Sequence, residues 1–163
     1  RRECDLPVDD AVDGAIPEEN RIYITPPNRD VEVIKGRLKL SEARSGPMPK
    51  PDINRFFRSL ATDRGANCIG IILSGTGTDG AAGMIEIKSA GGITITQSPK
   101  TAKYDGMPLA SIHADAADLV LAPGEIVSTL LNFDQNKLTA SDFSLLASED
   151  TYTTIVDMVL RET

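Results

Sequence analysis

The sequence of 163 residues has no tryptophan, one histidine, two cysteines and only 4% aromatic residues. Cys4 and Cys68 lie far apart without a Cys-x-x-Cys pair, which argues against a disulfide framework and against a zinc site. The sequence also lacks an apolar run long enough to cross a bilayer. We therefore expect a cytoplasmic protein without membrane insertion.

An excess of basic residues is missing as well. The 17 Lys and Arg are outnumbered by 24 Asp and Glu, which gives a formal net charge of -7. Because binding to phosphates needs clustered cations, and the basic residues here are scattered, we expect no nucleic-acid partner. The hydrophobic fraction of 40% is ordinary for a globular protein and, at this length, indicates one domain with a sizeable core.

The first part of the chain has the pattern of β-strands. Residues 22 to 40 contain a β-rich run up to Pro26-Pro27 and then two alternating segments around Lys35-Gly36, a pattern that predicts a hairpin. Residues 41 to 50 combine Pro, Gly and Ser without periodicity and are predicted to form a loop.

An amphipathic helix is predicted next. Asp52 stands where it can cap the helix start, and Gly65 where it can end the helix. The apolar residues between them recur at i, i+3, i+4 and i+7: Ile53, Phe56, Phe57 and Leu60.

The central part of the chain predicts a strand-helix-strand unit. A buried strand over residues 68 to 74 precedes a helix over 81 to 91 and a strand over 93 to 97. A short helix starting at Pro108, the strand "ADLVLAP" and the helix "GEIVSTLL" follow. Since such crossovers are right-handed and join parallel strands, we expect an α/β fold: a doubly wound, mostly parallel sheet with a β-hairpin in a Rossmann-like, three-layer arrangement.

The last residues change in character. Residues 132 to 144 are polar, and a periodic segment follows with apolar residues on one helical face: Tyr152, Ile155, Val156, Val159 and Leu160. We predict one domain over residues 1–131, followed by a polar linker and a C-terminal helix over 132–163.

The stretch "SGTGTDG", residues 74 to 80, is a glycine-rich loop between the first strand and helix of this unit. Its Gly-x-Gly-x-x-Gly spacing is that of dinucleotide-binding loops, in which a helix N-terminus binds pyrophosphate. Asp79 would repel that phosphate, and the acid expected about 20 residues further on is absent, because the next strand ends in Gln97. The pattern therefore disfavours a nucleotide site.

Two other interpretations of Asp79 stay open. An aspartate is a common helix N-cap and glycines permit a tight turn, so that the loop can be purely structural. The small polar residues, however, lie at the carboxyl end of a predicted central strand, where open α/β sheets place their sites. Asp79 would then be the acid that orients a histidine in a Ser-His-Asp triad.

The residues alone do not supply the rest of a triad. The single histidine, His113, has the pattern of a structural residue, and no serine lies in a Gly-x-Ser-x-Gly turn. Adjacent carboxylates do not by themselves converge in a pocket, so we expect the acidic pairs to be solvated. These pairs are Asp9-Asp10, Glu18-Glu19 and Glu149-Asp150.

Residues 70 to 108, "GIILSGTGTDGAAGMIEIKSAGGITITQSPKTAKYDGMP", resemble the catalytic domain of the CheB family of chemoreceptor methylesterases. The dipeptide Asp13-Gly14 and the stretches "RIYITPPN", "PDINRFFRSLA" and "AADLVLAPGEI" extend the resemblance over roughly residues 8 to 130. These motifs are specific in combination.

The resemblance implies a protein-glutamate methylesterase in chemotaxis-type signal transduction. Such enzymes hydrolyse glutamyl methyl esters on the cytoplasmic domains of methylated chemoreceptors, release methanol and often deamidate receptor glutamines. They use a Ser-His-Asp triad in a doubly wound α/β domain, with no metal or organic cofactor. Asp79 falls on the triad aspartate.

The resemblance also implies that parts of the domain lie outside this sequence. The family's serine and histidine precede the matched region and have no counterpart here, so we expect a domain without its N-terminal strands, inert as an esterase by itself. An exposed sheet edge would favour self-association. The variant "GTG", the "YITPPN" hairpin and the C-terminal segment look most like the methylesterase domain of proteins fused to a CheR-type methyltransferase. Many chemotaxis members have Met where this chain has Thr76, so the resemblance leaves the substrate preference open.

The alternative function is that of a non-catalytic scaffold or regulatory module of a signalling fusion protein.

Overall fold

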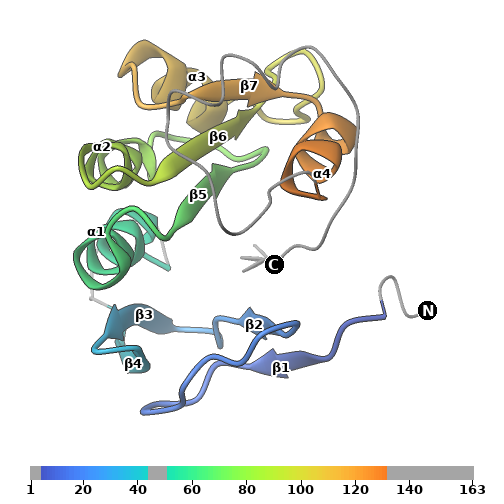
Figure 1. Ribbon diagram of the computed structural model, residues 1–163. Coiled ribbons are helices and arrows are strands. Elements are labelled where there is room, and N and C mark those ends of the chain that lie inside the picture. The colour runs from blue at the N-terminus through green and yellow to red at the C-terminus, as the bar shows by residue number, and fades with distance from the viewer. Residues whose placement is uncertain (1–4, 44–50, 132–163) are drawn as a thin grey trace.

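The computed structural model describes residues 5–43 and 51–131. Within them the chain forms a two-stranded parallel sheet, a two-stranded antiparallel hairpin and a three-stranded parallel sheet. Figure 1 shows the three-stranded sheet and its helices above, the two small sheets below, and helix α1 between them. This is the expected mixed α/β architecture with a parallel sheet.

The predicted hairpin is present. Strands β3 (Arg29–Ile34) and β4 (Arg37–Glu42) pair antiparallel, with Ile34 opposite Arg37. The two turn residues, Lys35 and Gly36, both have positive φ, 52° and 72°, as a two-residue hairpin turn of this hand requires.

A short strand that the sequence did not predict precedes the hairpin. Strand β1 (Val8–Asp10) pairs in parallel with β2 (Ile22–Ile24). Its three residues are all exposed, so β1 has no buried alternation that a sequence pattern could detect.

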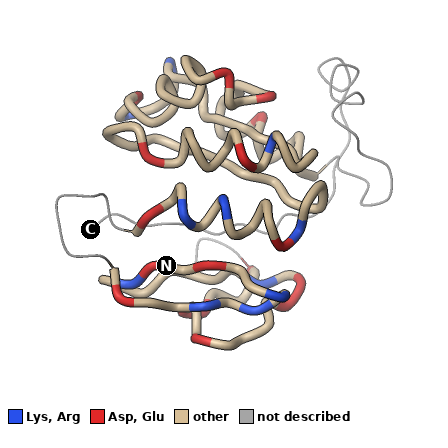
Figure 2. The backbone as a smooth tube through the Cα atoms, turned by 90° about the vertical axis from the view of Figure 1, so that its left-hand side faces the viewer, with Lys and Arg blue, Asp and Glu red and all other residues tan. Residues whose placement is uncertain are grey.

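Helix α1 (Ile53–Arg64) begins and ends as predicted. The Asp52 carboxylate accepts a hydrogen bond from the Arg55 backbone N–H at 2.8 Å, and the Gly65 N–H donates to Ala61 O. Figure 2 shows charges of both signs along this helix and the hairpin below it.

The main sheet has the order β5-β6-β7, formed by Ile69–Ile72, Ile93–Gln97 and Leu119–Leu121. All of its pairings are parallel, and helices α2 (Ala81–Ser89) and α3 (Gly106–His113) are its crossovers. Helix α3 begins two residues before the predicted start at Pro108, since Asp105 and not a residue next to the proline is its N-cap.

Two apolar clusters cover the two faces of this sheet. Met84 and Ile87 of α2 pack with Ile72 on one face. On the other face, Ile126 and Leu130 pack against β6; they belong to α4 (Pro123–Leu131). Figure 1 shows α4 on the side of the sheet opposite α2 and α3, as a doubly wound arrangement requires.

Several predictions concern residues outside the described part. These are the linker and helix over 132–163, most of the loop over 41–50, and Cys4. In residues 5–43 and 51–131, no helix is long and apolar enough to cross a membrane.

Candidate active site

The glycine-rich loop joins the carboxyl end of β5 to the start of α2. Gly80 ends the loop with a φ of +91°, a conformation that L side chains rarely adopt, and a Cβ there would lie 2.4 Å from Ile72 Cδ1. The loop can therefore turn tightly over the sheet and place the preceding residue, Asp79, at the carboxyl edge of the strands.

Asp79 is buried, with 8% of its surface exposed, and its carboxylate accepts four N–H donors. The backbone N–H of Ile53 donates to Oδ2 at 2.9 Å, whereas Oδ1 accepts from the backbone N–H groups of Asn54 at 3.2 Å and Gly80 at 2.9 Å. The side-chain amide of Asn54 donates to Oδ1 at 2.7 Å. These donors compensate the burial of a negative charge.

The interpretation of Asp79 as the N-cap of the helix that follows it was wrong, because Asp79 caps a different helix. The N-cap of α2 is Gly80, which makes no side-chain capping bond. Asp79 instead accepts the first N–H groups of α1, next to that helix's own N-cap, Asp52. Its negative charge lies at the positive end of the α1 dipole, where it is stabilised.

Asn54 completes an exchange of caps between the two helices. Its side-chain oxygen accepts the backbone N–H of Gly83 in the first turn of α2, at 2.7 Å. Gly83 permits this approach, since a Cβ there would lie 3.0 Å from Asn54 Cα. A residue beside α2 thus caps α1, and a residue of α1 caps α2.

The carboxylate of Asp79 retains acceptor capacity on one oxygen. A carboxylate oxygen has about two lone-pair positions. From the part of the chain that the structure describes, Oδ1 receives three donors and Oδ2 receives one, so Oδ2 is the oxygen with room for a further N–H, such as that of an imidazole.

The start of the loop is held by residues between the end of β6 and the first turn of α3. The Ser74 N–H donates to Gln97 Oε1 at 2.8 Å, and Ser74 Oγ accepts the Tyr104 N–H at 2.9 Å. The Met107 N–H donates to Gly75 O at 3.0 Å. The loop is therefore hydrogen-bonded near both of its ends, which fixes the position of Asp79 relative to the sheet.

The geometry gives no support to a phosphate cradle. Gly80 N–H and Gly83 N–H, two of the amides that a pyrophosphate would need, already donate to Asp79 and Asn54. Within the two described ranges, no group of three or more His, Cys, Asp or Glu is placed to hold a metal ion.

His113 does not approach Asp79. It is exposed and ends α3, whereas Asp79 follows β5 at the carboxyl edge of the sheet. A crossover helix runs antiparallel to its strands, so its last residue lies at the opposite, amino-terminal edge. The pairs Asp9-Asp10 and Glu18-Glu19 are exposed as predicted, and Glu149-Asp150 lies outside the described residues.

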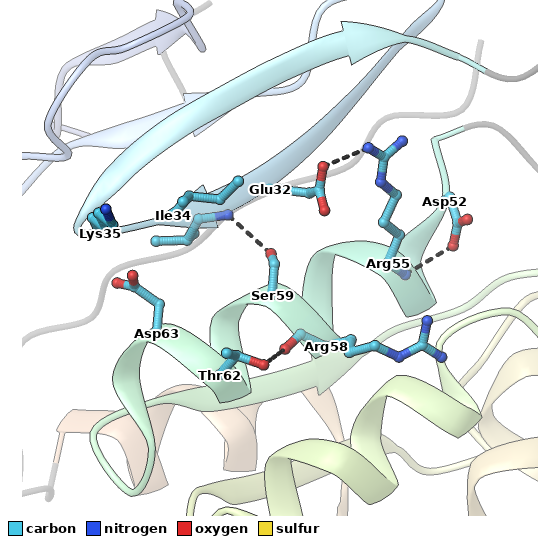
Figure 3. Close-up of a pocket in the computed structure, with 10 residues that line it drawn as sticks. Glu32, Ile34, Lys35, Asp52, Arg55, Arg58, Ser59, Thr62 and Asp63 are labelled. Atoms are coloured by element: carbon cyan, nitrogen blue, oxygen red, sulfur yellow. Dashed lines mark hydrogen bonds and ion pairs between the residues drawn. The ribbon is translucent and has the colours of Figure 1, made fainter.

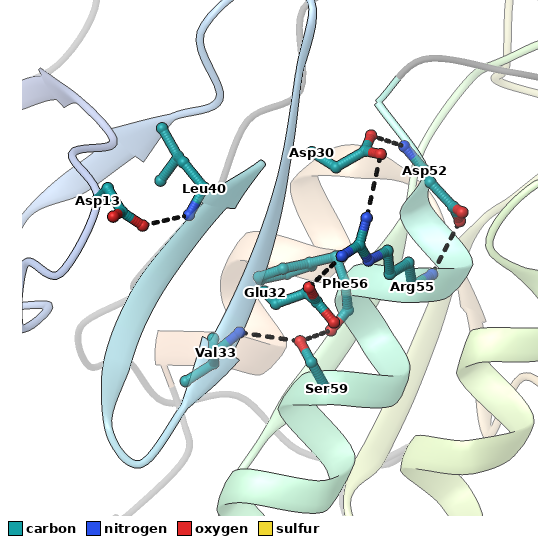
Figure 4. Close-up of polar contacts among 9 residues, drawn as sticks. All are labelled: Asp13, Asp30, Glu32, Val33, Leu40, Asp52, Arg55, Phe56 and Ser59. Carbon is teal, nitrogen blue, oxygen red and sulfur yellow. Dashed lines mark hydrogen bonds and ion pairs between the residues drawn. The ribbon is translucent and has the colours of Figure 1, made fainter. Parts of the chain in front are cut away.

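A set of ionic contacts between β3 and α1 holds the start of α1 in place (Figure 4). Asp30, of which 2% is exposed, accepts the Asp52 N–H at 3.1 Å and pairs with Arg55 at 3.5 Å. Arg55 also pairs with Glu32. The hairpin thus anchors the turn of α1 whose N–H groups bind Asp79.

A groove of about 680 Å³ lies between the hairpin turn and α1, beside these contacts (Figure 3). Asp79 does not line it. The carboxylates that line the groove already have partners: Glu32 pairs with Arg55, Asp52 caps α1, and Asp63 accepts the Gly36 N–H. The groove is therefore separate from the candidate site.

The fold and the loop define an α/β protein with a buried, N–H-bound aspartate at the carboxyl edge of its parallel sheet. The model of the CheB methylesterase family matches residues 1–130, and the chain belongs to that family. The crystal structure of the Thermotoga maritima CheB methylesterase catalytic domain is similar, with a TM-score of 0.63 and 26% identity. The likeness covers 72% of this chain and 64% of that chain.

Two curated relatives give the extent of the match. Protein-glutamate methylesterase/protein-glutamine glutaminase 2 of Rhodospirillum rubrum is 37% identical over 122 residues, which are 72% of this chain and 34% of that protein. Protein-glutamate methylesterase/protein-glutamine glutaminase 3 of Hahella chejuensis is 36% identical over 126 residues, 77% of this chain and 36% of that protein. The chain thus spans about a third of the length of these relatives.

Proposed function

We propose that this chain is part of a protein-glutamate methylesterase in which Asp79 is the acid of a Ser-His-Asp triad. The observation that carries the proposal is the geometry of Asp79: a buried carboxylate, bound by four N–H groups, with acceptor capacity left on Oδ2. The membership of the chain in the CheB family supports the reaction.

In this mechanism Asp79 accepts an imidazole N–H at Oδ2 and holds the ring in the tautomer that removes a proton from serine. The serine oxygen attacks the glutamyl ester, methanol leaves, and water hydrolyses the acyl-enzyme to glutamate. We assign the serine and the histidine to no residue of the described ranges. Asp79 is suited to its role because the two helices fix its carboxylate before substrate binds.

We propose methylated chemoreceptor cytoplasmic domains as the substrate and the cytoplasm as the place of reaction. The names of the relatives include protein-glutamine glutaminase, which supports deamidation of receptor glutamines as a second reaction. Thr76, exposed in the loop beside Asp79, is the residue of this chain that we expect to influence substrate preference.

The test is methanol release from methylated receptor by the full-length protein and its Asp79→Asn variant. We expect the variant to lose about 10⁴-fold in kcat, by analogy with the same substitution in serine proteases. The matched control is Asp118→Asn, because Asp118 also accepts a backbone N–H, that of Thr94 at 2.9 Å, but precedes β7 at the opposite edge of the sheet.

We expect the control variant to keep the parent's kcat. Equal losses in the two variants would mean that Asp79 only stabilises the fold. No methanol release by the folded full-length protein would contradict the esterase proposal altogether.

The second candidate function is a non-catalytic signalling module. The contact of Asp79 with α1 favours it, because a cap that joins two helices would be kept in a scaffold without catalysis. In a scaffold, Asp79→Asn would lower the free energy of unfolding and leave no esterase activity to be lost.

A further inference from the structure

We propose that Asn54 is a positioning residue for Asp79. Its side-chain amide orients the carboxylate and, being uncharged, places no second negative charge against it. The inference rests on the proposed function of Asp79 as the triad acid. It goes further because it identifies a residue of α1, on a separate element from the loop, as a determinant of the pH range of activity.

The contacts of Asn54 determine which end of its side chain faces Asp79. The Gly83 N–H is a donor, so the atom 2.7 Å from it must be the amide oxygen. The NH₂ group therefore faces Asp79 Oδ1, also at 2.7 Å. The amide cannot turn over without placing NH₂ against N–H and oxygen against a carboxylate.

Asn54 binds Asp79 at two points, because its backbone N–H also donates to Oδ1, at 3.2 Å. Among the described residues, these contacts and the Gly80 N–H occupy Oδ1, whereas Oδ2 accepts the Ile53 N–H alone and is the oxygen with room for an imidazole. The Gly80 N–H, at the end of the loop, donates to Oδ1 at 2.9 Å, so α1 and the loop together select the oxygen that faces the histidine.

An aspartate at position 54 would separate the two tasks of this side chain. It keeps an acceptor for the Gly83 N–H and so preserves the cap of α2. Toward Asp79, however, it replaces a donor by a second carboxylate at hydrogen-bond distance. Two carboxyl groups at such a distance share a proton. Such a pair loses its protons in two steps, and the pKa of one step is raised.

The other charged groups on the surrounding elements are the same in the parent and in Asn54→Asp. On α1 these are Asp52, which caps the helix, and Arg55, which pairs with Asp30 and Glu32 of β3. Lys103 and Asp105 precede α3, and α2 has no acidic residue in its first turn. A difference between the two pH profiles therefore reports on position 54 alone.

The experiment compares kcat/KM against pH for the full-length parent, Asn54→Asp and Asn67→Asp. Asn67 is exposed in the turn after α1, so Asn67→Asp adds the same charge away from Asp79. We expect the acidic limb of the Asn54→Asp profile to move up by about one pH unit or more, with the activity at high pH largely kept. The Asn67→Asp profile should match the parent's.

A second variant, Asn54→Ala, removes the donor without adding charge. We expect its kcat to fall by about tenfold to hundredfold, with KM and the acidic limb near the parent's values. If Asn54 were only a helix cap, Asn54→Asp would have the parent's profile and Asn54→Ala would lose stability but not kcat.

A readout besides activity separates this inference from the proposed function. In Asn54→Asp, the ¹³C resonances of the two facing carboxyl groups should follow two coupled steps with pH, as expected of a pair that shares a proton. An active parent with superimposable profiles would overturn the role of Asn54 and leave the esterase intact. An inactive parent would overturn the esterase, and a single-step titration in Asn54→Asp would overturn the shared proton.

Discussion

The side-chain oxygen of Asn54 lies 2.7 Å from the backbone nitrogen of Gly83, so that α1 supplies the cap that α2 lacks in its own sequence. This contact requires the two helices to approach closely at Gly83. A Cβ there would lie 2.6 Å from Phe57 Cβ and 3.0 Å from Asn54 Cα. The packing of two helices and the orientation of Asp79 therefore depend on the same position.

Gly83→Ala should separate the helices. The added methyl group would have to displace backbone atoms of α1, so we expect a loss of about 1–3 kcal/mol in the free energy of unfolding. Urea denaturation measures it. Gly124→Ala is the control, since nothing lies within 4 Å of a Cβ there, and its stability should stay within about 1 kcal/mol of the parent's. Similar values for the two variants would contradict the close packing at Gly83.

Arg55→Met should destabilise the start of α1, because it removes the cation that pairs with the buried carboxylate of Asp30. We expect a loss of about 1–3 kcal/mol, below the range for fully buried pairs because the Arg55 side chain is 25% exposed. Arg55→Lys should recover only part of it, since one ammonium does not replace a planar fork shared by Asp30 and Glu32. Full recovery in urea denaturation would contradict this.

Asp13 should contribute to stability at neutral pH and not in acid. The Leu40 N–H, which donates at 2.8 Å, and then Lys39 lower the pKa of its carboxyl group below the ordinary value. A carboxyl group with a lowered pKa in the folded state stabilises the fold above its unfolded pKa, and this contribution is lost as the pH falls through the folded pKa.

The measurement is the urea midpoint of the parent and Asp13→Asn between pH 7 and pH 2. We expect the parent to be more stable at pH 7 and the difference to close below about pH 3.9, the ordinary pKa of aspartate. Added salt should reduce the difference, because the group is exposed. A difference that persists unchanged at pH 2 would mean that the charge of Asp13 is not its cause.

Local patterns were sufficient for most of the secondary structure. The turn at Lys35-Gly36, the cap at Asp52 and the end of α1 at Gly65 were predicted because each depends on residues within one turn of the chain. Strand β1 was missed because it pairs with residues 14 positions away, Val8 with Ile22, and buries none of its residues. Parallel pairing of this kind leaves no local signal.

The candidate site divides in the same way. The glycine spacing and position of Asp79 after a buried strand marked the loop, and the resemblance assigned its role. Asn54 was not predicted, because its partners Asp79 and Gly83 lie 25 and 29 residues further along the chain. An asparagine two residues after an N-cap has no pattern that indicates either contact.

By itself, the sequence determined the order of strands and helices after β1, the family, and the glycine-rich loop that carries Asp79, because periodicity, turns and motifs are written in neighbouring residues. Only the tertiary structure decided that Asp79 caps α1 and not α2, which of its oxygens keeps acceptor capacity, and that Asn54 holds it. These properties depend on hydrogen bonds between elements that folding brings together, and such bonds exist only once both helices are packed on the sheet.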